Sequence, residues 1–290
     1  MKLAIVYGEI STKHQLIIDR AEDIFDSVLA APVDGLKYVH GEEQKVLYKD
    51  IDLTEFDAVY VRIDDRDAIF AEHLVEVLNN EGVVTQAEND TFAYDSNKFY
   101  NMKVLAENGV NVPDSVYTLS PGMAVSAAER LGYPVIMKTV RGAGGTGVMR
   151  AGSENELKPV MDTMKSLEQD ICLQEYIEHG GSDTRMVVIG DYVTAYGRTS
   201  GGEDWRSNIS AGGERIDVEV NEEMEQIALR AARSTGFDIC GCDMIEVDGD
   251  YYIIEVNGAF AVNEAMNEII GQDVVLQLVE RMHEKAMKRS

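Results

Sequence analysis

The sequence predicts a mixed α/β (α+β) protein in which a parallel α/β domain precedes a larger region of helices and hairpins. Over about the first 90 of the 290 residues, short apolar segments alternate with helical patterns, as in parallel sheets. Further along, two pairs of apolar segments are each joined by a short turn, which is typical of antiparallel hairpins. Because 45% of the residues are hydrophobic, two or three packed units can each have a core.

The first domain, residues 1–93, is expected to alternate strands and helices. Apolar residues at helical spacing predict its helices, and short apolar runs bounded by turn residues predict its strands. The predicted elements are, in order, a strand at 3–7, a helix at about 15–29, a strand at 57–63, a helix at about 67–78 and a short strand at 82–85.

The remaining chain is divided into a central subdomain, residues 94–183, and a C-terminal subdomain, residues 184–290. The predicted helices lie at 98–108, 126–131, 154–165, 222–235 and 273–288. The predicted strands lie at 133–138, 148–150 and 171–177, followed by hairpins at 185–198 and 241–257. No internal repeat interrupts this order.

The charge of the chain limits its partners. There are 52 acidic and 26 basic residues, and the net charge of −26 would repel nucleic acid and anionic membranes. Three cysteines do not make a disulfide framework. Residues 1–7 lack the pattern of a signal peptide, and no apolar run reaches membrane-spanning length. We therefore expect a soluble cytoplasmic protein that binds neither nucleic acid nor membrane; whether it forms a homo-oligomer stays open.

A glycine-rich segment follows the predicted strand at 133–138 and includes Gly142, Gly144 and Gly145. Its position between two strands differs from a dinucleotide fingerprint and from a Walker loop, which both lead into a helix. Such glycines can place backbone N–H groups over phosphates, or they can form an ordinary hairpin turn. Lys138, at the end of an apolar strand, favours the phosphate hypothesis, because a lysine there needs a partner unless its ammonium group reaches solvent.

Three oxygen-bearing side chains, those of Asp243, Glu255 and Asn257, lie in the last predicted hairpin. Oxygen ligands are what Mg²⁺ prefers, although carboxylates on a solvated sheet face would have the same pattern. Glu255 and Asn257 share a face by strand alternation. A three-residue loop at 248–250 places Asp243 opposite Glu255, whereas a two-residue turn places Cys242 there. The metal hypothesis therefore predicts the longer loop.

Weaker signals complete the set. Glu175, Tyr176 and Ile177 end a strand, where backbone groups can meet the edge of an adenine base. Arg198 and Arg206 lie near glycine-rich turns and are candidates for anion contacts, although such arginines are often only surface ion pairs.

Taken in order, these segments resemble the ATP-grasp superfamily and, within it, the RimK-type amino-acid ligases. The resemblance runs from about Asp95 to the last helix. It includes the lysine at the helix start in Asp95-Ser96-Asn97-Lys98, the lysine and glycine loop from Tyr133 onward, Gln174-Glu175-Tyr176-Ile177, Gly181-Ser182-Asp183-Thr184-Arg185, Trp205-Arg206-Ser207-Asn208, and the triad of Asp243, Glu255 and Asn257. Residues 1–93 fit the domain that precedes an ATP-grasp fold.

The resemblance implies an ATP-dependent ligase. ATP would phosphorylate a substrate carboxylate, and an amine would displace phosphate from the acyl phosphate to form an amide. The implied roles are Lys98, Lys138 and the glycine loop for the phosphates, Glu175, Tyr176 and Ile177 for adenine, Asp183 for ribose, Arg198 for further nucleotide contact, Arg206 and Asn208 at the reacting phosphate, and Asp243, Glu255 and Asn257 for two Mg²⁺ (or Mn²⁺) ions.

The implied substrates are a small-molecule or peptide carboxylate and an amino acid, which we expect to be glutamate. Two segments differ from the family. Residues 209–213 keep two glycines but lack an arginine, and residues 258–261 replace a Ser/Pro-rich turn. Both would hold substrate. An ATP-grasp phosphotransferase and a non-catalytic nucleotide-binding module are the alternative hypotheses.

Overall fold

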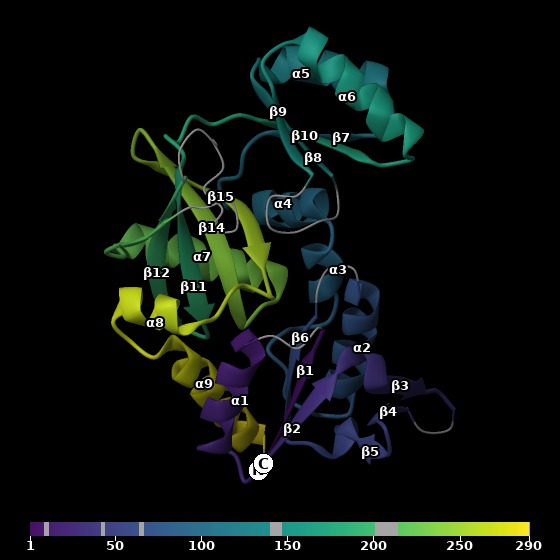
Figure 1. The fold of residues 1–290 in the computed structure, drawn as a ribbon, viewed down its shortest axis with the longest axis vertical. Helices are drawn as coiled ribbons and strands as arrows, with labels where there is room; N and C mark the ends of the chain where they lie inside the picture. The colour runs from purple at the N-terminus through teal and green to yellow at the C-terminus, as the bar shows by residue number, and fades with distance from the viewer. Residues whose placement is uncertain (9–11, 42–43, 64–66, 140–146, 201–213, 290) are drawn as a thin grey trace.

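The computed structural model describes residues 1–8, 12–41, 44–63, 67–139, 147–200 and 214–289. In this part of the chain the strands form four sheets. Figure 1 shows the N-terminal unit at the bottom, a five-stranded sheet in the middle and a four-stranded sheet with two helices at the top. The mixed class predicted from sequence is confirmed.

The N-terminal unit contains a parallel sheet in the order β2-β1-β6, formed by Ser27–Pro32, Lys2–Tyr7 and Ala58–Arg62. Alternate residues of β1 face opposite sides. Leu3 and Ile5 pack against the helices α1 (Thr12–Glu22) and α9 (Val274–Arg289), whereas Ala4 and Val6 pack on the side of α2 (Ala68–Asn80). The last helix of the chain therefore completes the core of the first unit.

The predicted helix at 15–29 is wrong in its second half. Helix α1 ends at Glu22, and residues 27–32 form strand β2 beside β1, with Leu3 opposite Val28. Val28 and Leu29 match a helical period, but parallel pairing with a buried strand determines their structure. The sequence also did not predict the small antiparallel sheet of β3 (Leu36–Val39), β4 (Lys45–Tyr48) and β5 (Ile51–Asp52) with its flanking turns η1 (Val33–Gly35) and η2 (Leu53–Glu55).

The four-stranded sheet has the order β7-β10-β8-β9, formed by Ser115–Thr118, Ile171–Glu175, Val135–Thr139 and Val148–Ala151. Helices α5 (Pro121–Leu131) and α6 (Glu154–Ser166) cover one face, where they pack on Met137 and Leu173. Because side chains alternate along a strand, Lys138 and Cys172 lie on the opposite face. Helices α3 (Thr91–Asp95) and α4 (Lys98–Glu107) connect this sheet to the N-terminal unit.

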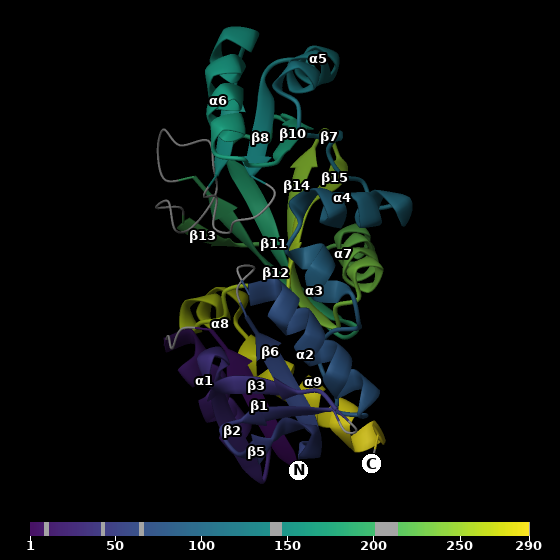
Figure 2. The ribbon, with the colours of Figure 1, turned by 90° about the vertical axis from the view of Figure 1, so that its right-hand side faces the viewer.

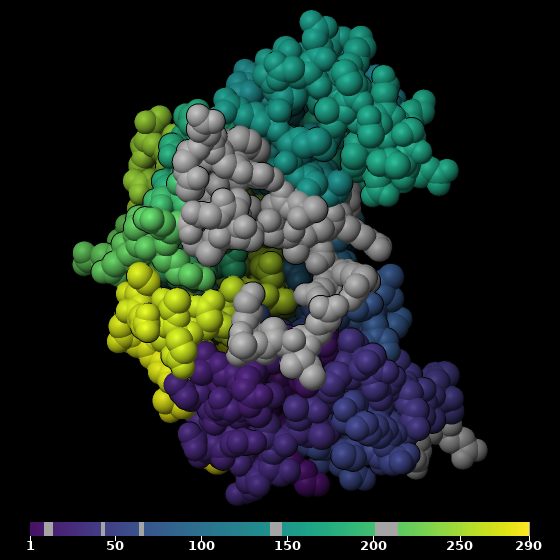
Figure 3. Space-filling model, in the orientation of Figure 1, coloured from purple at the N-terminus to yellow at the C-terminus, as the bar shows by residue number. Residues whose placement is uncertain are grey.

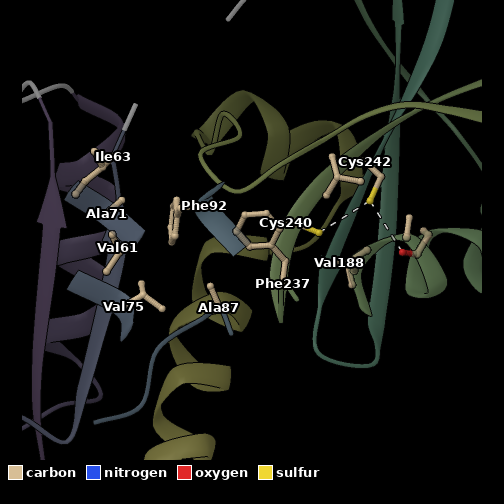
Figure 4. Packing of buried hydrophobic residues seen from close by; sticks show 14 of the residues in the cluster. Val61, Ile63, Ala71, Val75, Ala87, Phe92, Val188, Phe237, Cys240 and Cys242 are labelled. Carbon is tan, nitrogen blue, oxygen red and sulfur yellow. Dashed lines mark hydrogen bonds between the residues drawn. The ribbon is translucent and has the colours of Figure 1, made fainter. Parts of the chain in front are cut away.

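The five-stranded sheet is antiparallel and has the order β13-β12-β11-β14-β15. Its strands are Glu214–Asp217, Tyr192–Thr199, Ser182–Ile189, Ile239–Val247 and Asp250–Asn257. Helix α7 (Glu222–Thr235) covers one face, and the short helix α8 (Glu264–Ile270) follows β15 (Figure 2). Figure 4 shows that the buried cluster extends from Val61 through Phe92 and Phe237 to Cys240, so the first unit and the five-stranded sheet share a core.

The cysteines are packed thiols. All three are free and buried, and the sulfur atoms of Cys240 and Cys242 lie 3.9 Å apart on the side of α7. Across the described ranges, we find no helix with the length and apolar character needed to cross a bilayer.

Candidate functional site

The site lies where the face of the four-stranded sheet opposite α5 and α6 meets the end of β15. Helix α4 contacts both β7 and β15, and it begins with Lys98 after the Asn97 cap, whose side chain accepts a hydrogen bond from the Tyr100 N–H group at 3.1 Å. The Nζ atom of Lys98 lies 3.3 Å from Oε1 of Glu255. Two predicted site residues that are 157 positions apart are therefore in contact. Figure 3 shows the four-stranded sheet and its helices, in teal, at the opposite end of the molecule from the purple N-terminal unit.

Lys138 belongs to the same site. It is half-buried opposite Cys172, and its charged neighbours are Glu255, Lys98 and Asp243. Desolvation lowers the pKa of Lys138, and the attraction of the Glu255 carboxylate only partly offsets this effect. Two lysines thus face one accessible carboxylate. An additional anion can offset this local positive charge, which agrees with the phosphate role predicted for both residues.

Asp243 and Glu255 face each other, but not for the predicted reason. The loop is the two-residue turn of Asp248 and Gly249, both with positive φ, and Val247 pairs with Asp250. The expected three-residue loop is wrong. A β-bulge shifts the register so that Met244 pairs with Ile253 while Asp243 pairs with Glu255. The bulge restores the facing carboxylates that the longer loop was expected to provide.

Asp243 is enclosed by arginines. Arg185 is its cross-strand neighbour, and its Nε and Nη2 atoms contact the Asp243 carboxylate, the second at 3.0 Å. Nη2 of Arg198 lies 2.9 Å from Oδ2 of Asp243. Burial opposes ionisation of Asp243, but the two guanidinium groups outweigh it and hold the pKa of this carboxyl below its ordinary value. Asp243 is therefore an anion in a network of buried charges.

Two further predicted residues take part in this network. Asp183 and Arg198 are opposite each other on β11 and β12, and Nε of Arg198 donates to Oδ1 of Asp183 at 2.6 Å. Arg198 thus bridges the residue predicted to hold ribose and the residue predicted to hold metal. Sequence analysis did not predict this contact, although it named both partners.

The predicted metal triad has a suitable set of donors. The Glu255 side chain is 34% exposed, and within the described ranges its ion pair with Lys98 is made through Oε1, which leaves Oε2 for a cation. The Oδ1 atom of Asn257 accepts a hydrogen bond from the N–H group of Ala259 at 2.8 Å, which fixes the amide at the end of β15. Among the described residues, no three His, Cys, Asp or Glu side chains lie close enough together to bind one metal ion. The triad is of a different kind, because one of its members is an amide, and its oxygen atoms suit Mg²⁺.

The predicted adenine segment follows the end of β10. Glu175 exchanges two hydrogen bonds with Asp114: its N–H group donates to the Asp114 carbonyl, and its Oε1 atom accepts from the Asp114 N–H group, both at 2.9 Å. The Arg150 guanidinium lies 4.2 Å from the centre of the Tyr176 ring. Because Met149 packs on the side of α5 and α6, the adjacent Arg150 lies on the opposite face, so Tyr176 is on the same side of the sheet as Lys138.

Some of the predicted residues lie outside the described part of the chain, namely Gly142, Gly144, Gly145, Arg206 and Asn208. Sequence analysis missed Arg215, on β13, which is opposite Arg198 and lies over the ring of Tyr196 at 5.6 Å. Its strand is only four residues long, with no apolar alternation to predict it.

The fold is ATP-grasp. The site lies between two sheets, with Lys138 on the four-stranded sheet, Lys98 at the start of α4, and the facing carboxylates of Asp243 and Glu255 on the β14–β15 hairpin. Among solved structures, the ATP-grasp ligase PsnB in complex with minimal precursor, Mg and ADP has a TM-score of 0.74 and 18% identity, with 98% of this chain and 97% of that chain covered. D-alanine–D-alanine ligase from Bacillus anthracis, complexed with ATP, has a TM-score of 0.69 and 14% identity over 99% and 98%.

The particular family follows from sequence comparison. The RimK-like ATP-grasp domain matches residues 95–282, and the chain therefore belongs to this family. A probable alpha-L-glutamate ligase from Xanthomonas euvesicatoria pv. vesicatoria (strain 85-10) is 30% identical over 246 residues, which cover 84% of this chain and 83% of that protein. The predicted fold and family are confirmed.

Proposed function

We propose that this ATP-dependent carboxylate–amine ligase adds glutamate to the carboxylate of a peptide or small molecule. The observation that carries the proposal is the contact of Lys98 with the accessible carboxylate of Glu255, with Lys138 beside them. Membership of the RimK-like family and the resemblance to a probable glutamate ligase support the reaction and the amino acid. The structure of PsnB in complex with precursor peptide PsnA2 supports a peptide as one acceptor. We place the reaction in the cytoplasm, where ATP is available.

Lys98 and Lys138 would bind the phosphates of ATP from two sides. Glu255, Asn257 and Asp243 would hold two Mg²⁺ ions, and bound Mg²⁺ supplies positive charge to the transferring phosphoryl group. Asp243 has to share its carboxylate between this role and the two arginines that contact it. In this arrangement, Arg185 and Arg198 orient Asp243 toward Glu255 and keep it ionised.

The chemistry needs no protein nucleophile. The substrate carboxylate attacks the γ-phosphate, ADP leaves, and the amine then attacks the acyl carbon and releases phosphate. The protein acts by positioning and by neutralising charge. We also propose that residues 1–93 form the N-terminal α/β domain, residues 94–183 the central ATP-grasp subdomain with its glycine-rich lid, and residues 184–290 the C-terminal ATP-grasp subdomain with the metal site.

The test is a screen for ADP release from ATP and Mg²⁺ with paired acceptors and amino acids. We expect glutamate-dependent ADP release, a hydroxamate when hydroxylamine replaces the amine, and no turnover with Glu255→Gln or excess chelator. A phosphate ester in place of the hydroxamate would favour a phosphotransferase. Release with neutral amino acids and none with glutamate would refute the amine assignment alone.

A further inference from the structure

Arg62 lies at a functional edge of the N-terminal unit. It is the last residue of β6, and in the parallel sheet it is beside Tyr7, the last residue of β1. Ligands of open α/β sheets bind at the carboxyl ends of parallel strands. This edge meets the segment after β15, because Nη2 of Arg62 donates to the Phe260 carbonyl at 2.5 Å.

The charge of Arg62 is buried, and it has no counter-charge within the described part of the chain. The residue is only 6% exposed, and its Nη1 atom is buried without a hydrogen-bond partner. No acidic side chain among the described residues pairs with it. Its surroundings are apolar and aromatic, with Tyr7, Tyr60 and Phe260 in the same buried cluster. A guanidinium group in such a place is costly unless an anion joins it.

A second donor lies beside it. The hydroxyl group of Tyr60, two residues earlier on the same face of β6, is also buried, and its O–H group has no acceptor among the described residues. Burial raises the pKa of Tyr60, and the charge and hydrogen bonding of the neighbouring Arg62 oppose this shift. The hydroxyl therefore remains a neutral donor. A water molecule can satisfy both hydrogen-bonding groups, but only an anion can also balance the charge of Arg62.

The position of Arg62 links it to the reaction. Phe260 follows Ala259, whose N–H group donates to Oδ1 of the predicted metal ligand Asn257 at 2.8 Å. The guanidinium group thus contacts the backbone three residues beyond Asn257, in the segment expected to hold substrate. An acceptor-only group bound between Arg62 and Tyr60 can receive hydrogen bonds from both.

We propose that Arg62, with the Tyr60 hydroxyl, binds a carboxylate of the substrate and thereby selects acidic substrates. The proposal rests on the proposed function and deepens it. One competing source of a carboxylate is the chain itself, since Asp64 and Asp65 follow closely in sequence, outside the described residues. The experiment has to separate these two sources.

The variant is Arg62→Met, which keeps the length of the side chain and removes its charge. Arg20→Met is the matched control, because Arg20 also joins the N-terminal unit to the C-terminal part, through Asp273 at 2.6 Å and Glu264 at 3.5 Å. In the ADP-release assay, we expect Arg62→Met to raise the KM for glutamate or for the acidic acceptor about 10- to 100-fold, with the KM for ATP unchanged. Arg62→Lys should fall between the variant and the wild type, and Arg20→Met should leave all of these constants unchanged.

A binding assay separates this proposal from the choice of glutamate. Melting temperatures are measured with L-glutamate and succinate, and with their neutral counterparts L-glutamine and succinamide. A rise with the carboxylates alone, present in wild type and Arg20→Met and absent in Arg62→Met, supports the site even if no amino acid drives ADP release. An equal rise in Arg62→Met overturns it. So does a loss of stability in Arg62→Met that disappears when Asp64 and Asp65 are replaced by Asn, because the counter-charge then belongs to the chain.

Discussion

Asp243 and Glu255 face each other on one hairpin, yet replacing their carboxylates should affect the stability of the fold very differently. We predict that Asp243→Asn abolishes turnover and strongly destabilises the protein, whereas Glu255→Gln abolishes turnover and leaves stability nearly unchanged. The difference comes from their partners, since two buried arginines contact Asp243 and one partly exposed lysine contacts Glu255.

The magnitudes follow from burial. The side chains of Asp243, Arg185 and Arg198 are 7%, 8% and 6% exposed. Among the described residues, the amide would leave Arg198 with Asp183 as its acidic contact and Arg185 with none. Removing one partner of a buried pair costs about 3–5 kcal/mol. The Lys98–Glu255 pair is 16% and 34% exposed, and at most about 1 kcal/mol is expected from it.

The assay is thermal unfolding without nucleotide, beside ADP release. With about 2–4 °C for each kcal/mol in a chain of this size, Asp243→Asn should lower Tm by roughly 6–20 °C and Glu255→Gln by less than about 4 °C. Asp243→Glu is the control that retains the charge. If Asp243→Asn melts within about 2 °C of the wild type, the buried-network argument is wrong, whatever the effect on turnover.

Further predictions concern nucleotide binding, acid stability and close packing. Lys138→Ala should weaken ATP binding in a calorimetric titration and leave the melt intact, and wild-type affinity should fall as pH rises through the lowered pKa of Lys138. Because the folded pKa of Asp243 lies below that of the unfolded chain, its contribution is present above about pH 4 and is lost at lower pH. Asp243→Asn should therefore show a shallower loss of Tm below about pH 4 than wild type, and an equal slope would refute this. Gly241→Val should destabilise the protein by about 2 kcal/mol or more in denaturant unfolding, because a Cβ atom there would lie 2.8 Å from Phe260 Cβ and 2.9 Å from Arg185 Cδ.

The order of sequence motifs predicted most of the candidate site residues. The length of a hairpin turn could also have predicted one of the contacts between them. The predicted hairpin through Gly190 and Asp191 has a two-residue turn, which places Asp183 opposite Arg198, as the structure does. The salt bridge between them was thus implicit in that prediction. The β-bulge beside Asp243 was not, because Ile253 and Ile254 are both apolar and the pattern carries no sign of a skipped residue.

Contacts between segments that are distant in sequence could not be predicted from the sequence. The Lys98–Glu255 pair joins the start of α4 to β15, and nothing in either segment specifies the other. The strand at 27–32 illustrates the same limit, because its pairing with β1 overrides a helical pattern. Both features depend on tertiary packing between segments, whereas the order of motifs can be read directly from the sequence.

In a chain with a net charge of −26, most of the cations near the candidate site are paired with acidic side chains. Arg185 and Arg198 are neutralised by Asp183 and Asp243, and Lys98 is held by Glu255. Lys138 and Arg62 differ from these, because neither has a hydrogen-bonded acidic partner among the described residues. In a chain with twice as many acidic as basic residues, a cation without such a partner cannot be explained by a shortage of carboxylates. A bound anion would account for both positions, and we propose a phosphate at Lys138 and a carboxylate at Arg62.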